Sequence, residues 1–410
     1  MLRKKIHAIV ILILLIIFLT PNFCQAYEYA NLDYYVSYFY NRYSKHFDNF
    51  SLKYKSPEYG ITDWKTPETP REWMSLASYY KYKSLQGDIN AKQALRSAIQ
   101  NGFLASFKKP AYAQSFEDAE SYFLMIRIFE EDNNLINSFE QKKILYQIRS
   151  YIEAGIKAQD TENRAIVAAA HWQYIVDYLH KKNILKDNQK RYFDNLIKVK
   201  IDRAIENCIN DKAWYFENNW KDFSPHYHTV SAFMLMVYGA LTQQDKYLAI
   251  AKEMYYNIKK ISFKNGMTEA RLGNRPIGLG AQFYLMQGLL GKYFDDEDYT
   301  VYLFYAGGHR FFSDKQHPDR LEYHSTLENS DSQFHDDYAF SDKAELGLTI
   351  EKLHNINLNF KYFFTHPIQE SKDKYFVIKN TGTSIVFGNK IGILGSYGNW
   401  SHIYQYAEHN

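Results

Sequence analysis

The sequence is short of cysteine, which limits the covalent chemistry open to it. Its 410 residues include two cysteines, Cys24 and Cys208. Residues 1–26 begin with basic side chains, continue with an apolar run and end in Cys24-Gln25-Ala26, a pattern typical of a secretory signal peptide. Because removal of this segment leaves Cys208 alone, the mature chain cannot form an intramolecular disulfide. We expect Cys208 to be a buried small side chain.

The mature chain also lacks net charge. The formal charge of +3 belongs to Arg3, Lys4 and Lys5, without which 46 basic residues face 46 acidic residues. A neutral chain exerts no long-range attraction on nucleic acid or membranes, so we expect neither as a partner after the signal is removed. An anionic ligand would have to meet a local cluster of bases.

A membrane-spanning run is the third feature that is missing. The apolar run 8–19 is shorter than the roughly 20 residues that cross a bilayer, which favours a cleaved signal and a secreted or periplasmic protein. An uncleaved N-terminal anchor is the alternative.

Aromatic side chains, by contrast, are abundant: the chain has 37 Tyr, 28 Phe and 6 Trp. Aromatic rings stack on the C–H faces of sugars, and phenol hydroxyls form hydrogen bonds at their rims. The composition therefore suits a carbohydrate ligand. The alternative is that most of these rings fill an aromatic core between helices.

Apolar residues recur at helical spacing along most of the chain. Short polar connectors join these segments, and three weakly similar helix–turn–helix boundaries near residues 82–88, 238–245 and 289–296 indicate repeated helix pairs. The sequence predicts a mainly α protein, an (α/α) toroid of antiparallel helix pairs over 27–355. The expected helices are 30–47, 70–86, 89–106, 115–131, 137–158, 161–181, 187–209, 226–241, 245–261, 276–291, 297–306 and 338–355.

The pattern changes after residue 355. Short β-branched and aromatic runs separated by turn residues predict a small antiparallel sheet of three or four strands. We expect 356–410 to be a small β-rich C-terminal segment that is too short to be a complete sandwich.

The first of three polar clusters opens the helix expected at 161–181. Asn163 and Arg164 at a helix start can hold a carboxylate, because the free backbone N–H groups add to the side-chain donors. Arg164 and His171 are seven residues apart and fall on one face, and Trp172 is adjacent to it. A helix cap and a buried, hydrogen-bonded His171 would also explain the pattern.

The second cluster is Ser-Pro-His-Tyr-His at the start of another helix. Histidine can take up a proton near neutral pH and tyrosine can act as acid or base, so His226, Tyr227 and His228 are candidates for proton transfer. Metal binding by the two histidines, with His171 or Glu269 as a third ligand, is the alternative. We favour proton transfer and expect no cofactor and no metal, since two histidines inside a helix would diverge by about 200°.

The third cluster lies on a glycine-rich segment before the helix expected at 276–291. Arg271 and Arg275 with Glu269 suit bidentate binding of a carboxylate or sulfate, with Glu269 fixing one guanidinium. A structural salt bridge between Glu269 and Arg271 is the alternative.

Taken together, these clusters resemble the alginate lyases and related heparinase-type polysaccharide lyases. The resemblance covers about residues 70–295 and rests on the order of Asn163-Arg164, the His/Tyr turn, Asn265-Gly266-Met267-x-Glu269-x-Arg271-x-x-x-Arg275, and Gly280-Ala281-Gln282-Phe283-Tyr284. It implies a secreted α/α toroid that cleaves a uronate polymer by β-elimination. In such enzymes Asn and a basic partner neutralise the sugar carboxylate, His or Tyr removes the adjacent proton, and Tyr protonates the leaving oxygen.

Transferred to this chain, the resemblance makes Asn163 the neutralising asparagine. Arg164 stands where the alginate lyases have the histidine of an Asn-Asn-His run, which is a departure. The tyrosine expected shortly after the arginine segment is also absent, because 277–279 are Ile-Gly-Leu. Tyr227 or Tyr284 would replace it.

Independently of the family, Asn163, Arg164 and Arg271 are suited to stabilising an enediolate, with His226 or His228 as the base and Tyr227 as the acid. Two other functions remain open. A glycoside hydrolase would need two carboxyl groups across the scissile bond, and a non-catalytic carbohydrate-binding protein of exopolysaccharide handling would hold sugar without turnover. The candidate carboxyl groups are Asp118, Glu120, Glu162, Glu269, Asp336 and Asp337.

Overall fold

The computed structural model describes most of the helical part of the chain and several strands. The described residues are 28–42, 44, 47, 69–103, 115–160, 162–217, 223–262, 268, 281–296, 302, 333–362, 374–378, 383–387, 390–397 and 400–407.

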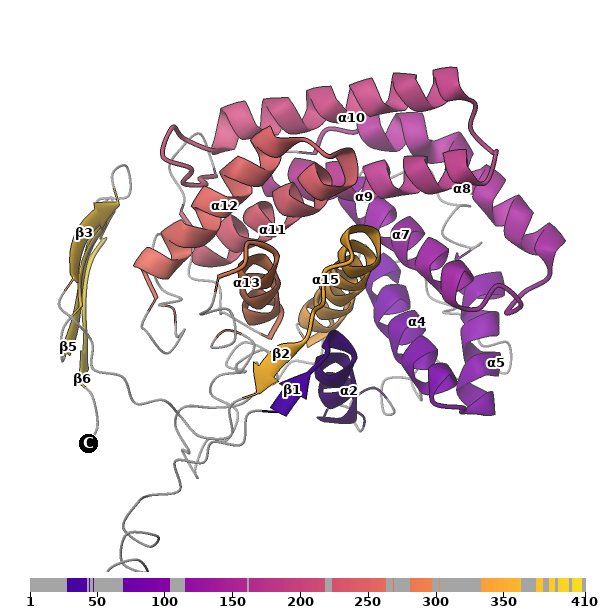
Figure 1. Ribbon diagram of the computed structural model, residues 1–410, viewed down its shortest axis with the longest axis horizontal. Coiled ribbons are helices and arrows are strands. Elements are labelled where there is room, and N and C mark those ends of the chain that lie inside the picture. Colours follow the sequence, from indigo (N-terminus) through magenta and orange to yellow (C-terminus); the bar gives the residue numbers. More distant parts are fainter. Residues whose placement is uncertain are drawn as a thin grey trace, which may run out of the picture.

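The described chain is mainly helical, as the periodicity predicts (Figure 1). One π-helix, η1 (Ala98–Phe103), continues from α5. The α-helices are α2 (Leu32–Arg42), α4 (Thr69–Leu85), α5 (Ile89–Ser97), α7 (Ser115–Glu131), α8 (Ser138–Lys157), α9 (Glu162–Lys181), α10 (Asp187–Cys208), α11 (Pro225–Thr242), α12 (Asp245–Lys260), α13 (Ala281–Tyr293) and α15 (Gln333–His354).

From α7 to α12, each helix begins and ends within one residue of its expected bounds. Local chemistry explains this agreement. Asn137 caps α8 by accepting the Glu140 N–H at 2.9 Å, and Gln243 ends α11 in a left-handed conformation with φ 54°. Elsewhere the bounds shift: α13 begins at 281 rather than 276, and α15 at 333 rather than 338. The helix expected at 297–306 lies outside the described residues, except for residue 302.

The helices pack as successive neighbours. Contacts run from α4 to α7, α9, α11, α13 and α15, and α15 in turn contacts α4. A second set lies outside these: α5 packs on α4, α8 on α7 and α9, α10 on α9, and α12 on α11. α15 also touches α7 and α11, and Figure 1 shows it among the other helices rather than at the edge. Side chains on α15 can therefore reach several helices at once.

Trp172 on α9 anchors the contact with α8. Its side chain is fully buried and lies over Gly155, with the ring of Tyr122 on α7 also nearby at 5.7 Å between centroids. A Cβ atom at Gly155 would lie 2.2 Å from Trp172 Cζ2. The absence of a side chain at 155 is therefore what allows α8 and α9 to approach.

We expect Gly155→Ala to lower the free energy of unfolding by about 1 to 3 kcal/mol, the usual cost of overpacking a core. This loss should outweigh the gain of up to about 1 kcal/mol that alanine brings to a helix interior. Urea unfolding measures it, and combining the change with Trp172→Leu should restore part of the loss. A single variant more stable than the parent would contradict the packing.

Two antiparallel sheets complete the described chain. β1 (Glu28–Ala30) pairs with β2 (Phe360–Tyr362), with Tyr29 opposite Lys361. β3 (Lys374–Ile378), β4 (Thr383–Phe387), β5 (Lys390–Tyr397) and β6 (Trp400–Ala407) follow one another in a four-stranded sheet. The division into a toroid over 27–355 and a β-rich segment over 356–410 stays a prediction, as does the signal peptide, which lies outside the described residues. Among the helices that the structure describes, none has the length and apolar character needed to cross a bilayer.

Candidate functional site

A tight turn between α10 and α11 prepares the first part of the site. Phe216 N–H donates to Cys208 O at 2.7 Å, and Asn210 N–H donates to Trp214 O at 3.0 Å. Asn257 on α12 also holds the turn, because its side-chain amide donates to the carbonyl of Lys212 at 2.8 Å. The turn is thus held rigidly by α10 and α12.

Tyr215 in this turn joins two of the clusters identified in the sequence. Its hydroxyl accepts the backbone N–H of Asn163 at 2.9 Å and donates to Glu217 Oε1 at 3.1 Å, while its own N–H donates to His228 Nδ1 at 3.2 Å. The starts of α9 and α11 therefore lie side by side. The side-chain amide of Asn163 is half-buried and makes no hydrogen bond within the part of the chain that the structure describes.

The backbone is strained at this junction. Glu162 and Ala213 have φ values of 59° and 55°, in the left-handed region that non-glycine residues rarely adopt. Such residues cost of order 1–3 kcal/mol each and cluster at functional sites. Glu162 precedes Asn163 and Ala213 lies two residues before Tyr215, so both strained residues lie at the contact between the turn and the start of α9.

His228 holds the structure together and does not have the geometry of a base. Its Nδ1 accepts the Tyr215 N–H, so Nε2 carries the proton and donates to Met254 O at 2.9 Å. Burial lowers its pKa to about 4, although the bond to Met254 acts in the opposite direction. With both nitrogens engaged, His228 has no lone pair for substrate or metal. The expectation of proton transfer at His228 is therefore corrected, and the alternative metal site at the two histidines does not fit.

His226 differs from His228 in its hydrogen bonds. Its side chain is 7% exposed, and Nδ1 has no hydrogen-bond partner among the residues that the structure describes. Burial, aided by the positive charge of Lys343, lowers its pKa to about 4. His226 is consequently neutral at pH 7, and its buried Nδ1 forms no hydrogen bond within the described residues. Tyr227 is half-buried beside it, with 5.4 Å between the ring centroids.

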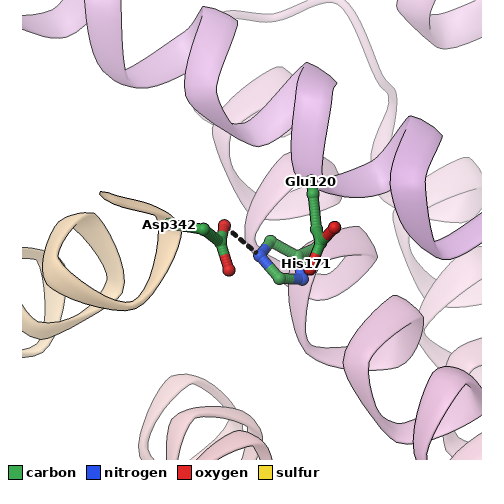
Figure 2. Close-up of side chains that lie close together, drawn as sticks. All are labelled: Glu120, His171 and Asp342. Atoms are coloured by element: carbon green, nitrogen blue, oxygen red, sulfur yellow. Dashed lines mark hydrogen bonds and ion pairs between the residues drawn. The ribbon is translucent and has the colours of Figure 1, made fainter. Parts of the chain in front are cut away.

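Lys343 belongs to a buried cluster that α15 builds with α7 and α9. Its Nζ lies 2.5 Å from Asp342 Oδ2 and 3.5 Å from Glu120 Oε1, and Asp342 Oδ1 lies 2.7 Å from His171 Nε2. Figure 2 shows Glu120, His171 and Asp342 converging from three separate helices. All four side chains are at most 4% exposed.

Two hydrogen bonds fix the orientation of the His171 ring. Nδ1 faces the Val167 carbonyl at 2.9 Å and must donate to it. Burial opposes ionisation of Asp342, but His171 and Lys343 outweigh it and hold the pKa of that carboxyl below its usual range. Both ring nitrogens of His171 are therefore engaged, Nδ1 by the Val167 carbonyl and Nε2 by Asp342. His171 is thus the buried, hydrogen-bonded histidine that the sequence leaves open as an alternative, and not a ligand for substrate.

The same cluster has ligand types that suit a metal ion. The candidate ligand atoms of Glu120, His171 and Asp342 lie within 4.8 Å of one another, and His171 donates its other N–H to a carbonyl as metal ligands do. However, Lys343 already places an ammonium group against both carboxylates, and the Nε2 proton is directed at Asp342. The negative charges are thus compensated by the protein, and the arrangement is that of an ion-pair cluster.

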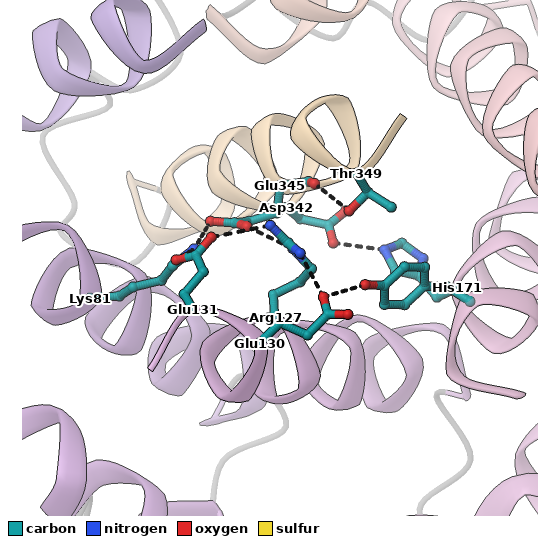
Figure 3. A network of polar contacts seen from close by, with 9 residues as sticks. Lys81, Arg127, Glu130, Glu131, His171, Asp342, Glu345 and Thr349 are labelled. Carbon is teal, nitrogen blue, oxygen red and sulfur yellow. Dashed lines mark hydrogen bonds and ion pairs between the residues drawn. The ribbon is translucent and has the colours of Figure 1, made fainter. Parts of the chain in front are cut away.

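A second buried network lies one turn further along α15. Glu345 bonds to Lys81 on α4 and accepts from Arg127 Nε on α7 at 3.2 Å. Arg127 also contacts Glu130 at 2.6 Å and Glu131 at 3.1 Å (Figure 3). The two networks together hold α4, α7 and α9 against α15.

The remaining sequence candidates lie in different places. Arg164 is exposed, with its guanidinium 5.4 Å from the centroid of the Phe116 ring. Trp172 is fully buried against α8, so this candidate for substrate binding is not accessible to a ligand, and Tyr284 is only 4% exposed. Glu269, Arg271 and Arg275 lie outside the described residues.

Asp118, one of the carboxyl groups considered for a hydrolase, has an unusual environment near the start of α7. Burial and the neighbouring charge of Asp160 raise its pKa to about 6. Asp160 itself pairs with Lys200 at 2.8 Å. The Asp118 carboxyl therefore changes its protonation state near pH 6.

This raised pKa predicts a pH dependence of stability. Between about pH 4 and pH 6 the folded chain binds more protons at Asp118 than the unfolded chain. The contribution of this proton binding to stability is therefore complete below pH 4 and is lost as pH rises through 6. We expect Asp118→Asn to be more stable than the parent by about 1 to 3 kcal/mol at pH 7, with little difference at pH 4. Urea titrations at both values measure this. Asp211→Asn at an exposed carboxylate is the control, and a gain independent of pH would contradict the assignment.

Sequence reasoning overlooked Tyr215, Glu217, Asp342 and Lys343. The sequence feature that could have identified Asp342 and Lys343 is the helix expected at 338–355, in which charged residues interrupt every apolar face. A helix that is charged all round needs partners on several sides. No comparable signal marks Tyr215, because its role depends on the fold of the turn.

Comparison of the sequence with protein-family models and with curated proteins finds no match.

Proposed function

We propose that the protein is a secreted polysaccharide lyase that cleaves a uronate-containing polymer by β-elimination. The observation that carries this proposal is His226, a neutral, buried histidine with an unpartnered Nδ1 at the start of α11. A base for C–H abstraction must be unprotonated at working pH and must have a free lone pair, and His226 meets both conditions.

The neighbouring groups supply the other requirements of elimination. The proton beside a carboxylate is too weakly acidic for histidine unless that carboxylate is neutralised by preorganised donors. The amide of Asn163, which has no hydrogen bond within the described residues, is suited to this task. In this proposal Nδ1 of His226 takes the proton, and the hydroxyl of Tyr227 protonates the departing oxygen.

We infer that the helices form the toroid expected from the sequence. The succession of contacts from α4 through α7, α9, α11 and α13 to α15, and from α15 to α4, supports an inner ring with α5, α8, α10 and α12 outside it. In such a ring the starts of α9 and α11 lie at the same end, where an acidic polysaccharide would bind.

The experiment is an incubation of the purified protein with alginate, hyaluronan and heparin. Elimination leaves an unsaturated sugar, so ultraviolet absorbance should rise together with new chain ends. New reducing ends without absorbance would replace the lyase by a hydrolase. Polymer retention without either would indicate a binding protein.

A glycoside hydrolase is the second candidate, and Asp118 is the observation in its favour. A carboxyl with a pKa near 6 is suited to be a general acid. The Asp118→Asn variant would then lose hydrolysis, whereas elimination should be unaffected by it.

A further inference from the structure

Three aromatic side chains are exposed on the outer helices α8 and α10, away from the starts of α9 and α11. Phe139 is 78% exposed, and Tyr146 and Tyr192 are each 43% exposed. Figure 1 shows both helices at the outer edge of the molecule. Phe139 is the most exposed large apolar side chain in the described part of the chain.

The spacing of these rings is regular. Phe139 and Tyr146 are seven residues apart on α8, which is two helical turns and about 10 Å on one face. Glu153 follows after another seven residues, and there the hydroxyl of Tyr192 on α10 donates to Glu153 Oε1 at 2.8 Å. Phe139 and Tyr146 therefore share one face of α8, and Tyr192 approaches the same helix at Glu153. We call Phe139, Tyr146 and Tyr192 the aromatic ladder.

Positive charge accompanies the ladder. The Arg149 guanidinium lies 6.0 Å from the centroid of the Tyr146 ring, and Lys157 Nζ lies 6.0 Å from that of Tyr192. Lys142 and Lys143 are exposed on the same face of α8, between the first two rings. The acids on this helix are already engaged: Glu140 accepts from its N-cap Asn137, and Glu153 pairs with Lys157. The four bases exceed the two acids, although the mature chain as a whole is neutral.

We propose that the aromatic ladder is a binding surface for a linear anionic polysaccharide, separate from the site at the starts of α9 and α11. Separate exposed rings suit a chain of sugars, since each ring covers one sugar face. The flanking bases complement carboxylate or sulfate groups on the polymer. A protein partner would require a continuous apolar patch, whereas charged side chains separate these rings.

The proposal does not depend on catalysis, because binding along α8 needs no turnover. The contribution of each ring to the affinity for the polymer can be estimated from aromatic contacts. These are worth about 0.5 to 1.5 kcal/mol each, or roughly a twofold to tenfold change in affinity per ring. Removal of all three should therefore abolish measurable binding to this surface. The replaced side chains are exposed, so the fold should be unchanged.

The test is affinity electrophoresis of the full chain in gels containing alginate, with dextran as a neutral polymer and polydeoxythymidine as a non-sugar polyanion. Phe139→Ala, Tyr146→Ala and Tyr192→Ala should each reduce retardation by alginate, and the triple variant should keep only the retardation that the separate site at the starts of α9 and α11 contributes. Val199→Ala removes another exposed apolar side chain, 65% exposed on α10, and should change nothing. Lys142→Gln with Lys143→Gln should weaken retardation and its dependence on salt.

Three results would overturn the proposal. The first is retardation by alginate that is unchanged in the triple ring variant. The second is retardation by polydeoxythymidine equal to that by alginate and equally insensitive to the rings, which would show that the surface binds by charge alone. The third is retardation by dextran equal to that by alginate, which would exclude an anionic polymer as the specific ligand. Circular dichroism of each variant establishes that its fold is intact.

Discussion

Replacement of His226 by glutamine is expected to lower kcat for elimination by about 10² to 10⁴, the usual contribution of a general base. Glutamine preserves the volume of the side chain and its hydrogen-bonding capacity but cannot take up the proton. His226 has no hydrogen bond at Nδ1 to lose, so the fold should tolerate the change. The initial rate of absorbance increase on the preferred uronate polymer is the measurement.

The pH dependence adds a second criterion. Burial and Lys343 lower the pKa of His226 to about 4, so the acidic limb of kcat/KM, which reports the free enzyme, should lie near pH 4 rather than 6.5. This limb should disappear in the glutamine variant. His180→Gln, at an exposed histidine paired with Asp187, should retain both the rate and the limb.

A variant of His228 distinguishes a loss of stability from a loss of catalysis. His228→Gln removes two buried hydrogen bonds and should lower stability by about 1 to 3 kcal/mol. At a temperature where that variant is folded, its rate should stay close to that of the parent. A full rate for His226→Gln together with a lost rate for His228→Gln would reverse our assignment of the base.

Arg127→Met should reduce the free energy of unfolding by about 3 to 5 kcal/mol, the usual cost of leaving buried charges without their partner. Arg127 is 3% exposed and contacts Glu130, Glu131 and Glu345. Methionine fills much of the space but leaves three carboxylates with less compensation. Since domains are typically stable by 5–15 kcal/mol, a large part of the total would be lost.

Urea unfolding followed by circular dichroism measures this effect, and Lys198→Met is a matched control. Lys198 pairs with Asp202 on the exposed face of α10, where an ion pair is worth about 0 to 1 kcal/mol. Equal losses in the two variants would show that the Arg127 network contributes no more than a surface pair. Because Arg127 lies away from His226, the remaining folded protein should show the parent's pH profile.

The helices could be predicted from the sequence because their signals are local. Apolar periodicity, caps such as Asn137 and polar connectors together define α7 to α12 within one residue. The sequence predicts the start of α15 five residues too late, because charged side chains interrupt its apolar pattern. Those charges serve partners on α4, α7 and α9, which no local pattern can reveal.

The site was predictable only by residue type. The sequence directed attention to His226 and His228 equally, yet Tyr215 and Met254 engage both nitrogens of one while Nδ1 of the other is left without a partner. Trp172 illustrates the same limit, since the sequence places it in a candidate cluster beside His171 and its ring instead covers Gly155. Which face of a helix points inward is settled by packing between distant segments.

The position of α15 has a consequence for the order of folding. Its residues Asp342, Lys343 and Glu345 are the partners of charges on α4, α7 and α9, which precede them by 160 residues or more along the chain. Until α15 is synthesised, Lys81 and Arg127 have only their partners Glu130 and Glu131 on α7, and His171 lacks Asp342. We therefore expect α4, α7 and α9 to reach their final packing only when α15 docks.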